Sequence, residues 1–352
     1  MKKLLFFSAV LWTFLSTAQS VRNEILVPVI PGYEVLKCDF HMHTVFSDGT
    51  VWPTVRAGEA WQEGLDAIAI TDHLEYTPNK EYVPVSHGTP YVLAEKTAAG
   101  LGLILIKGVE ITKSMPPGHF NALFVKDEAK IHQEDYRAAL REAKAQGAFV
   151  LWNHPGWKAQ APNGAVWMPE HEELFREGLF NGIEVVNHYE WYPEVLGWSR
   201  DKNLTVFANS DVHDPILNFL KQENLERRPI TLVFATERSP EGIREALQQG
   251  RTVGWFRNLL LGKTEWLETL FLASVSQRII TAGEKTTTLQ LTNLSDFAFE
   301  FAESENPEKV TLLPARSSVI LKVPRTESGT AYQVRNLLPG PGEPVTIKLP
   351  LN

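Results

Sequence analysis

Short apolar runs rich in β-branched residues recur between residues 35 and 235, separated by polar stretches that carry helix-forming residues. The apolar runs cover residues 36–41, 65–70, 101–106, 120–125, 148–152, 182–186, 204–208 and 230–234. Segments 53–63, 134–146, 169–177 and 240–249 lie between or after them and begin with Pro or acidic residues, as helices often do. Alternation of this kind predicts an α/β domain with a largely parallel sheet, closed as a barrel or open.

The pattern changes after about residue 277. Residues 279–351 are rich in Thr, Ser, Pro and Gly, with short alternating runs at 287–291, 310–312, 319–323 and 345–349. Such runs, bounded by turn residues, are typical of strands in an all-β domain. We therefore predict two domains, at 19–277 and 278–352, of which the second is a small C-terminal all-β sandwich.

The first residues have the pattern of a cleaved secretory leader. Lys2 and Lys3 precede an apolar run over residues 4–15, and the small residues Ser16, Thr17 and Ala18 follow it. This order predicts a signal peptide over residues 1–18 and a periplasmic or secreted mature chain. The alternative, an N-terminal membrane anchor, needs about 20 apolar residues. We therefore expect no stable membrane span after cleavage.

Charge and cysteine content narrow the possible partners. Cys38 is the only cysteine, so no disulfide can form within the chain. The formal net charge is −8, and removing the two leader lysines lowers it by two, to −10. An acidic chain of this kind is poorly suited to binding the nucleic-acid backbone. Nothing in the sequence predicts the oligomeric state.

Histidines and carboxylates gather at the ends of the predicted strands. The candidates are His41, His43, Asp48, His73, Glu110, His119, His154, Asp211 and His213. Around Met42, period-two alternation puts the imidazoles of His41 and His43 on one face, where one metal could take both. A single histidine is more often a core or surface residue than a ligand, and Asp48 taken alone is ordinary turn chemistry. Six histidines at one rim of a sheet instead indicate a metal site.

The residue types indicate which metals suit such a site. Neutral imidazoles and carboxylates accept Zn, Mn or Fe, and with one cysteine in the chain a thiolate zinc site is excluded. A carboxylate can also bridge two cations and reduce their repulsion. Barrels and open α/β sheets carry their active sites at the carboxyl ends of strands, where these residues fall.

Taken together, these motifs resemble the PHP family, named after polymerase and histidinol phosphatase. The family's H-x-H is matched at 41–43, S-D-G at 47–49, T-D-H at 71–73 and G-x-E at 108–110, followed by His119, His154 and D-x-H at 211–213. The resemblance covers about residues 35–254 and implies a distorted (β/α)7 barrel with two or three divalent ions. The leader and the β domain also resemble the extracytoplasmic Sb-PDE-like phosphodiesterase branch.

The resemblance implies a role for each ligand. His41, His43, Glu110 and Asp211 would hold a first metal, Glu110 would bridge to a second held by His119 and His154, and Asp48, His73 and His213 would hold a third. A hydroxide bridging two metals could then attack phosphorus while the third metal neutralises phosphoryl oxygens. We predict Asp211 as part of this catalytic apparatus. We also predict a catalytic role for His188, which ends a strand and would point toward the cluster.

The predicted function is metal-dependent hydrolysis of a small-molecule phosphate ester, with phosphodiesters as the preferred class. A 3′–5′ exonuclease or a phosphomonoesterase of the same fold is the nearest alternative. A carbon–nitrogen hydrolase of the amidohydrolase type would usually have a barrel Lys or Cys in place of Glu110 as bridging group. A binding protein with structural metals would have closed, four-coordinate sites.

Overall fold

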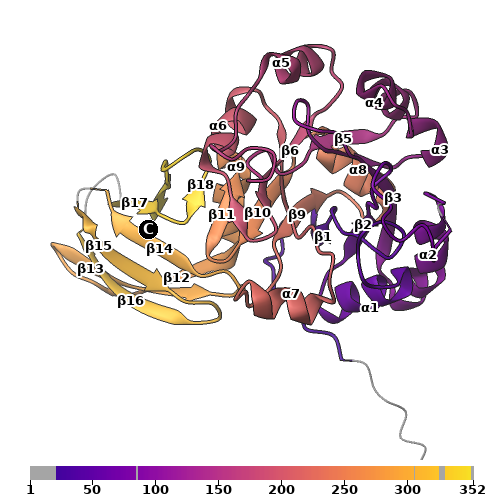
Figure 1. The fold of residues 1–352 in the computed structure, drawn as a ribbon. Coiled ribbons are helices and arrows are strands. Elements are labelled where there is room, and N and C mark those ends of the chain that lie inside the picture. Colours follow the sequence, from indigo (N-terminus) through magenta and orange to yellow (C-terminus); the bar gives the residue numbers. More distant parts are fainter. Residues whose placement is uncertain (1–20, 85, 305, 325–329, 350–352) are drawn as a thin grey trace, which may run out of the picture.

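The structure is a computed structural model that describes residues 21–84, 86–304, 306–324 and 330–349. The signal peptide predicted over residues 1–18 lies outside the described residues. Figure 1 shows a large α/β part and, beside it, a smaller part made of strands from the C-terminal third of the chain. Among the described helices, none combines the length and apolar character needed to cross a membrane.

The α/β part is built on one curled sheet. Its strands are β1 (Glu34–Asp39), β2 (Ala67–Ile70), β3 (Ile104–Ile111), β4 (Phe120–Leu123), β5 (Phe149–Trp152), β6 (Gly182–Asn187), β7 (Glu190–Trp191), β8 (Thr205–Asn209), β9 (Ile230–Ala235), β10 (Thr252–Phe256), β11 (Leu259–Gly262) and β18 (Leu337–Leu338). Strands β1, β2 and β3 are parallel neighbours, as are β5, β6 and β8. The apolar runs predicted from the sequence therefore form the sheet, and the α/β fold class is confirmed.

The expectation of a largely parallel sheet is wrong in two places. Strand β4 runs antiparallel to both β3 and β5. The segment 112–119 between β3 and β4 is too short for the crossover that a parallel pair requires, so the chain turns back directly. Strand β9 also runs antiparallel to β1, β10 runs antiparallel to β9, and β11 runs antiparallel to β10.

Helices cover the outside of the curled sheet (Figure 1). They are α1 (Pro53–Gln62), α2 (Thr89–Leu101), α3 (Glu128–Ile131), α4 (Tyr136–Ala145), α5 (Pro169–Arg176), α6 (Pro193–Asp201), α7 (Ile216–Gln222), α8 (Pro240–Gln248) and α9 (Thr264–Ser274). Proline, whose missing N–H costs nothing in the first turn, begins α1, α5, α6 and α8. Side chains of Asp135 and Ser239 accept backbone hydrogen bonds at the starts of α4 and α8.

The two sides of the sheet meet where β1 and β8 end. The amide of His43 donates to the carbonyl of Val212 at 3.0 Å, and the amide of Asp211 donates to the carbonyl of His41 at 2.9 Å. Deeper in the barrel, the rings of Phe40 and Phe207 pack edge to face with centroids 5.7 Å apart. These contacts bring two ligand-bearing segments, about 170 residues apart in sequence, into direct backbone contact.

The C-terminal part consists of two small antiparallel sheets. One contains β12 (Val275–Ala282), β13 (Thr286–Asn293) and β16 (Ser318–Pro324), and the other β14 (Phe299–Glu303), β15 (Asn306–Leu313), β17 (Thr330–Val334) and β19 (Val345–Leu349). The apolar core continues into the α/β part, where Phe297 packs on Trp255 with centroids 4.7 Å apart. Strand β12 runs across the boundary predicted after residue 277, and that boundary stays a prediction.

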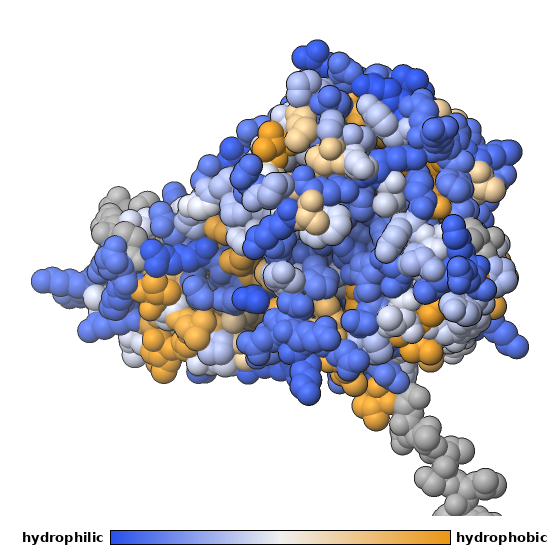
Figure 2. All heavy atoms as spheres, in the orientation of Figure 1, coloured by the Kyte–Doolittle hydropathy of each residue, from blue (hydrophilic) through white to orange (hydrophobic). Residues whose placement is uncertain are grey.

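Some apolar side chains of the C-terminal part remain outside its core. Val310, Leu312 and Ile320 are among the exposed apolar residues of β15 and β16. Figure 2 shows apolar surface on this part of the molecule, whereas the visible face of the α/β part is mostly polar. Scattered exposed apolar residues are ordinary on soluble proteins, so these positions alone indicate no partner.

Candidate metal centre

Local strand direction explains how the predicted ligands reach one rim of the sheet. His41 and His43 follow the end of β1, His154 follows β5, and Asp211 follows β8, so these residues lie at the carboxyl ends of parallel strands. His119 instead precedes β4. Because β4 is antiparallel, its start lies beside the ends of β3 and β5, and His119 joins the same rim.

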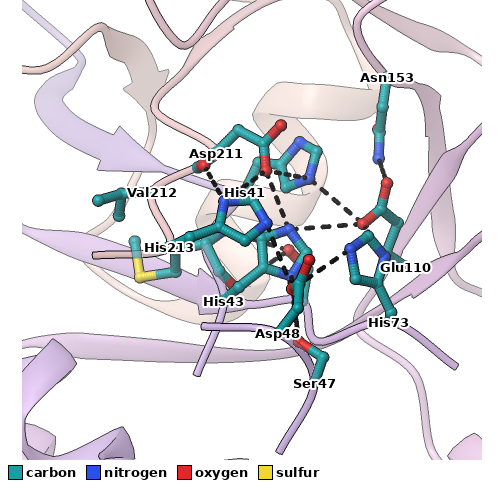
Figure 3. Close-up of polar contacts among 12 residues, drawn as sticks. His41, His43, Ser47, Asp48, His73, Glu110, Asn153, Asp211, Val212 and His213 are labelled. Atoms are coloured by element: carbon teal, nitrogen blue, oxygen red, sulfur yellow. Dashed lines mark hydrogen bonds and ion pairs between the residues drawn. The ribbon is translucent and has the colours of Figure 1, made fainter. Parts of the chain in front are cut away.

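All nine predicted ligands fall into groups whose side-chain donor atoms lie within 4.8 Å of one another. The groups are His43, Asp48, His73 and His213; His41, Glu110 and His154; His41, His43 and Asp211; and His73, Glu110 and His119. Members shared between groups make this one continuous cluster (Figure 3). Several buried groups of His, Glu and Asp are consistent with a multinuclear metal site.

Four buried side-chain atoms at the middle of the cluster have no hydrogen-bond partner among the described residues. They are His41 Nε2, His43 Nε2, Glu110 Oε2 and Asp211 Oδ1. The two imidazole nitrogens lie 3.2 and 2.9 Å from the Asp211 oxygen and 3.6 and 3.5 Å from the Glu110 oxygen. Ligand atoms about 2.1 Å from a tetrahedral metal lie roughly 3.4 Å from one another.

This arrangement fits a bound cation. Buried polar atoms without partners cost free energy and are rare in folded proteins. A cation among these four atoms would satisfy all of them at once. The donor set of two imidazoles and two carboxylates suits Zn, Mn or Fe equally, so it leaves the metal's identity open.

Two further positions flank the central one. On one side, Glu110 Oε1 lies 2.8 Å from His119 Nδ1 and 3.6 Å from His154 Nε2. On the other, Asp48 Oδ1 lies 3.3 Å from His213 Nε2 and 3.5 Å from His73 Nε2. The two oxygens of Glu110 therefore face different ligand groups, as a bridging carboxylate would. Which residues hold which ion stays a prediction.

Neighbouring charges and burial raise the pKa of some histidines of the cluster and lower the pKa of others. Burial, together with His213 and His73, lowers the pKa of His43 to about 3, so its imidazole is neutral and able to bind a metal. Burial alone would also lower the pKa of His41, but Asp211, Glu184 and Glu110 outweigh it and raise that pKa well above its usual value. The negative carboxylates favour the protonated His41 ring, and a bound metal would supply the positive charge in its place.

Glu184 is a residue of the site that was not predicted from the sequence. Its side chain is fully buried in β6 and accepts hydrogen bonds from Asn187 Nδ2 at 2.8 Å, Asn209 Nδ2 at 2.9 Å and the amide of His154 at 2.8 Å. Its other contact is His41 Nδ1, at 2.8 Å. This carboxylate orients one ligand ring and fixes the backbone of another. A charged residue inside the apolar run 182–186 was the available signal.

Arg56 of α1 is a second missed residue. Its guanidinium is buried and donates to the backbone carbonyls of His43 at 3.0 and 3.2 Å, Val212 at 3.3 Å and His213 at 3.0 Å. It also pairs with Glu59 at 2.7 Å. Arg56 thus joins the H-x-H and D-x-H segments from behind, through their backbones. No sequence motif predicts this role for Arg56, because the acceptors of its hydrogen bonds are backbone carbonyls.

His188 lies outside the metal groups. Its backbone has a φ of 57°, and its ring packs against Phe219 and Tyr189 with centroids 4.7 and 5.1 Å away. Burial lowers its pKa, while nearby Asp211 acts in the opposite direction. His188 is therefore near the cluster without joining it, and its catalytic role stays a prediction.

Trp157 follows the end of β5 and borders the second position. Its ring centroid lies 5.8 Å from that of His119 and 5.3 Å from that of His154, and the residue remains 41% exposed. An exposed aromatic ring beside two candidate ligands forms part of the wall of the site.

Comparison with known proteins agrees with the fold and the site. The chain is similar to a two-domain protein from Bacteroides vulgatus whose crystal structure contains a predicted PHP-like metal-dependent phosphoesterase. The TM-score is 0.90 and the identity 42%, over 95% of this chain and 99% of that one. An uncharacterized protein of Methanocaldococcus jannaschii is 29% identical over 192 residues, which cover 51% of this chain and 83% of that protein. No family model matches.

The chain belongs to the PHP-like metal-dependent phosphoesterase family. The likeness to the Bacteroides vulgatus protein spans both the α/β part and the C-terminal sheets. Family membership agrees with the motif resemblance drawn from the sequence and with the buried His, Glu and Asp groups.

Proposed function

We propose that this protein hydrolyses phosphodiesters at a multinuclear metal centre, as the extracytoplasmic Sb-PDE-like branch of the family does. The observation that carries the proposal is the set of four buried, unpartnered ligand atoms on His41, His43, Glu110 and Asp211. A structural site would be closed by its own ligands, whereas this cluster continues into two further ligand groups at the open rim of the sheet.

The protein's own residues would hold the metals and orient the substrate. Bound divalent metals would supply Lewis-acid chemistry and lower the pKa of a coordinated water. Glu110 would keep two ions close together, since its two oxygens face different histidine groups. Asp48, with His73 and His213, would hold the ion that neutralises the phosphoryl oxygens. Asp211, as a ligand of the central ion, would be part of the catalytic apparatus.

Charge at the rim supports a diester over a monoester. A phosphodiester carries one negative charge, whereas a monoester near neutral pH carries close to two and needs more cationic partners. Two lysines follow strands at this rim, and both lie near carboxylates. Lys113 pairs with Glu75 at 2.7 Å, and Lys158 lies 3.7 Å from Glu190. The net charge of −8 also argues against a long nucleic-acid substrate.

We further propose that the enzyme acts in the periplasm or outside the cell on a small-molecule phosphate ester. The leader predicted over residues 1–18 supports this location. Zn, Mn and Fe all suit the ligand set, so the test below includes each of them.

The test is hydrolysis of bis(p-nitrophenyl) phosphate and p-nitrophenyl phosphate by protein loaded with Mn²⁺, Fe²⁺ or Zn²⁺. We expect the diester to be the better substrate. His41→Ala should abolish turnover, because it removes a ligand of the central ion. His132→Ala is the matched control, since His132 is exposed and its imidazole is hydrogen-bonded to His87, away from the candidate ligands. Turnover of neither ester by metal-loaded protein would overturn the proposal.

A further inference from the structure

A cavity of about 490 Å³ opens at the end of the barrel opposite the metal cluster. Asn181, Thr205 and Phe149, which line it, lie at or just before the starts of β6, β8 and β5, whereas the candidate ligands follow the strand ends. Its polar lining comes from Lys144, Asn181, Lys202, Asn203, Thr205, Gln248, Gln249 and Lys263. None of the lining residues is acidic, in a chain whose net charge is −8.

The three lysines of this cavity are incompletely neutralised. The ammonium of Lys263 makes no hydrogen bond or ion pair with any residue in the described ranges, and its Nζ lies against the backbone of Gly250. The ammonium of Lys144 donates to Asn181 Oδ1 at 2.6 Å, which is a neutral acceptor. Lys202 alone has a carboxylate partner, Glu172 at 2.8 Å. Burial lowers the pKa of Lys144, as expected for an ammonium without a nearby counter-charge.

A second cavity adjoins the first and extends it. It has a volume of about 200 Å³ and shares Asn203, Leu204 and Lys263 with the larger one. Its lining also contains no acidic residue and is less polar, with Val206 and Pro339 contributing. Lys263 therefore lies where a polar chamber and a more apolar one meet.

We propose that the joined cavities bind a small organic anion with at least two negative charges, at a site separate from the metal centre. Lys144 and Lys263 would neutralise the charges, and the amides of the larger chamber would donate hydrogen bonds to the anionic oxygens. The smaller chamber would take the apolar body of the ligand. The volume suits a ligand of this size, because small-molecule sites commonly enclose about 300–1,000 Å³.

The alternative is that the lysines only complement helix ends. Helices α4, α6 and α8 all end beside the larger cavity, and cationic side chains are favourable near a helix C-terminus. That role needs no ligand. Replacing the lysines would then lower stability while leaving anion binding unchanged, so binding and stability measured together separate the two explanations.

The experiment is isothermal titration calorimetry of the metal-loaded protein with naphthalene-1,5-disulfonate, a rigid dianion with an apolar body. We expect saturable binding that weakens at least tenfold in the double variant Lys144→Met and Lys263→Met. Lys130→Met, which changes an exposed lysine of α3 elsewhere on the surface, should leave the affinity unchanged. Circular dichroism checks that each variant is folded, and the single variant Lys263→Gln serves if the double variant is not.

Binding to the metals themselves is distinguished by His41→Ala. The proposal predicts that this variant still binds the dianion, because the cavity lies at the other end of the strands. Loss of binding in His41→Ala together with normal binding in the lysine variants would overturn the proposal, as would the absence of binding by the wild-type protein.

Discussion

His41 Nδ1 lies 2.8 Å from Glu184 Oε1 in a fully buried contact between β6 and the segment after β1. The same imidazole presents its Nε2 to the centre of the ligand cluster. A carboxylate bonded to one ring nitrogen keeps the proton there and leaves the other nitrogen free to bind a metal. Glu184 therefore fixes the orientation of a candidate ligand ring from inside the barrel.

The first prediction concerns this contact. Glu184→Gln keeps the shape of the side chain but removes its charge, so the His41 ring is less well held in its metal-binding tautomer. We expect metal affinity or kcat/KM to fall by about 10- to 100-fold. Competition with a chromogenic chelator measures the affinity, and ester hydrolysis measures the activity.

Glu284→Gln provides the matched control for Glu184→Gln, because Glu284 is exposed in the turn between β12 and β13. It should behave as wild type in both assays. Wild-type metal affinity and activity in folded Glu184→Gln would mean that Glu184 does not position His41.

The second prediction concerns the stability of the two ligand segments. Arg56→Met leaves the buried carbonyl of His43 without a donor, removes one of two donors to the carbonyls of Val212 and His213, and takes away the cationic partner of Glu59. We expect the free energy of unfolding to fall by about 3 kcal/mol or more. Urea denaturation measures the change.

For comparison, Arg141→Met removes an arginine that is 58% exposed and pairs with Glu177. Its cost should stay below about 1 kcal/mol. Equal costs for the two arginine variants would show that the buried contacts of Arg56 contribute no more than a surface ion pair.

The third prediction concerns the protons that metal binding releases from the histidines of the cluster. Burial alone would lower the pKa of His73, but Glu110 and Asp48 outweigh it and raise that pKa well above its usual value. The pKa of His213 is likewise raised, by Asp48 and Asp211 against the effect of burial. The raised pKa values favour the protonated rings in the absence of metal, and a metal that binds there must displace those protons.

Metal binding should therefore release protons, and its apparent affinity should decrease as the pH falls below the raised values. Calorimetry in two buffers of different ionisation enthalpy measures the released protons directly. Proton release of zero at pH 7 would contradict this assignment of charge.

The fourth prediction is that metal removal destabilises the fold. A bound cation would give all four atoms at the cluster centre a partner, so metal bound to the native state should add to stability. Dialysis against dipicolinate should lower the thermal unfolding midpoint by several degrees, and added metal should restore it. His41→Ala should show a much smaller difference between the two conditions. An unchanged midpoint in chelated wild-type protein would argue that no metal supports this fold.

Most of the fold, and the grouping of the candidate ligands, was predictable because both follow from short-range sequence patterns. Apolar runs such as 148–152 and 230–234 form β5 and β9, and most candidate ligands lie within a few residues of such a run. The antiparallel direction of β4 was missed, since apolar periodicity is the same for either strand direction. Glu184 and Arg56 were missed because their partners lie far away in sequence or are backbone carbonyls.

Metal binding at the cluster is tested most directly by a crystal structure of the metal-loaded protein, with anomalous diffraction recorded at the Zn, Fe and Mn absorption edges. We predict at least two anomalous peaks, one of them bounded by His41 Nε2, His43 Nε2, Glu110 Oε2 and Asp211 Oδ1. Well-ordered crystals of active protein with no anomalous peak among these four atoms would show that they do not bind a metal.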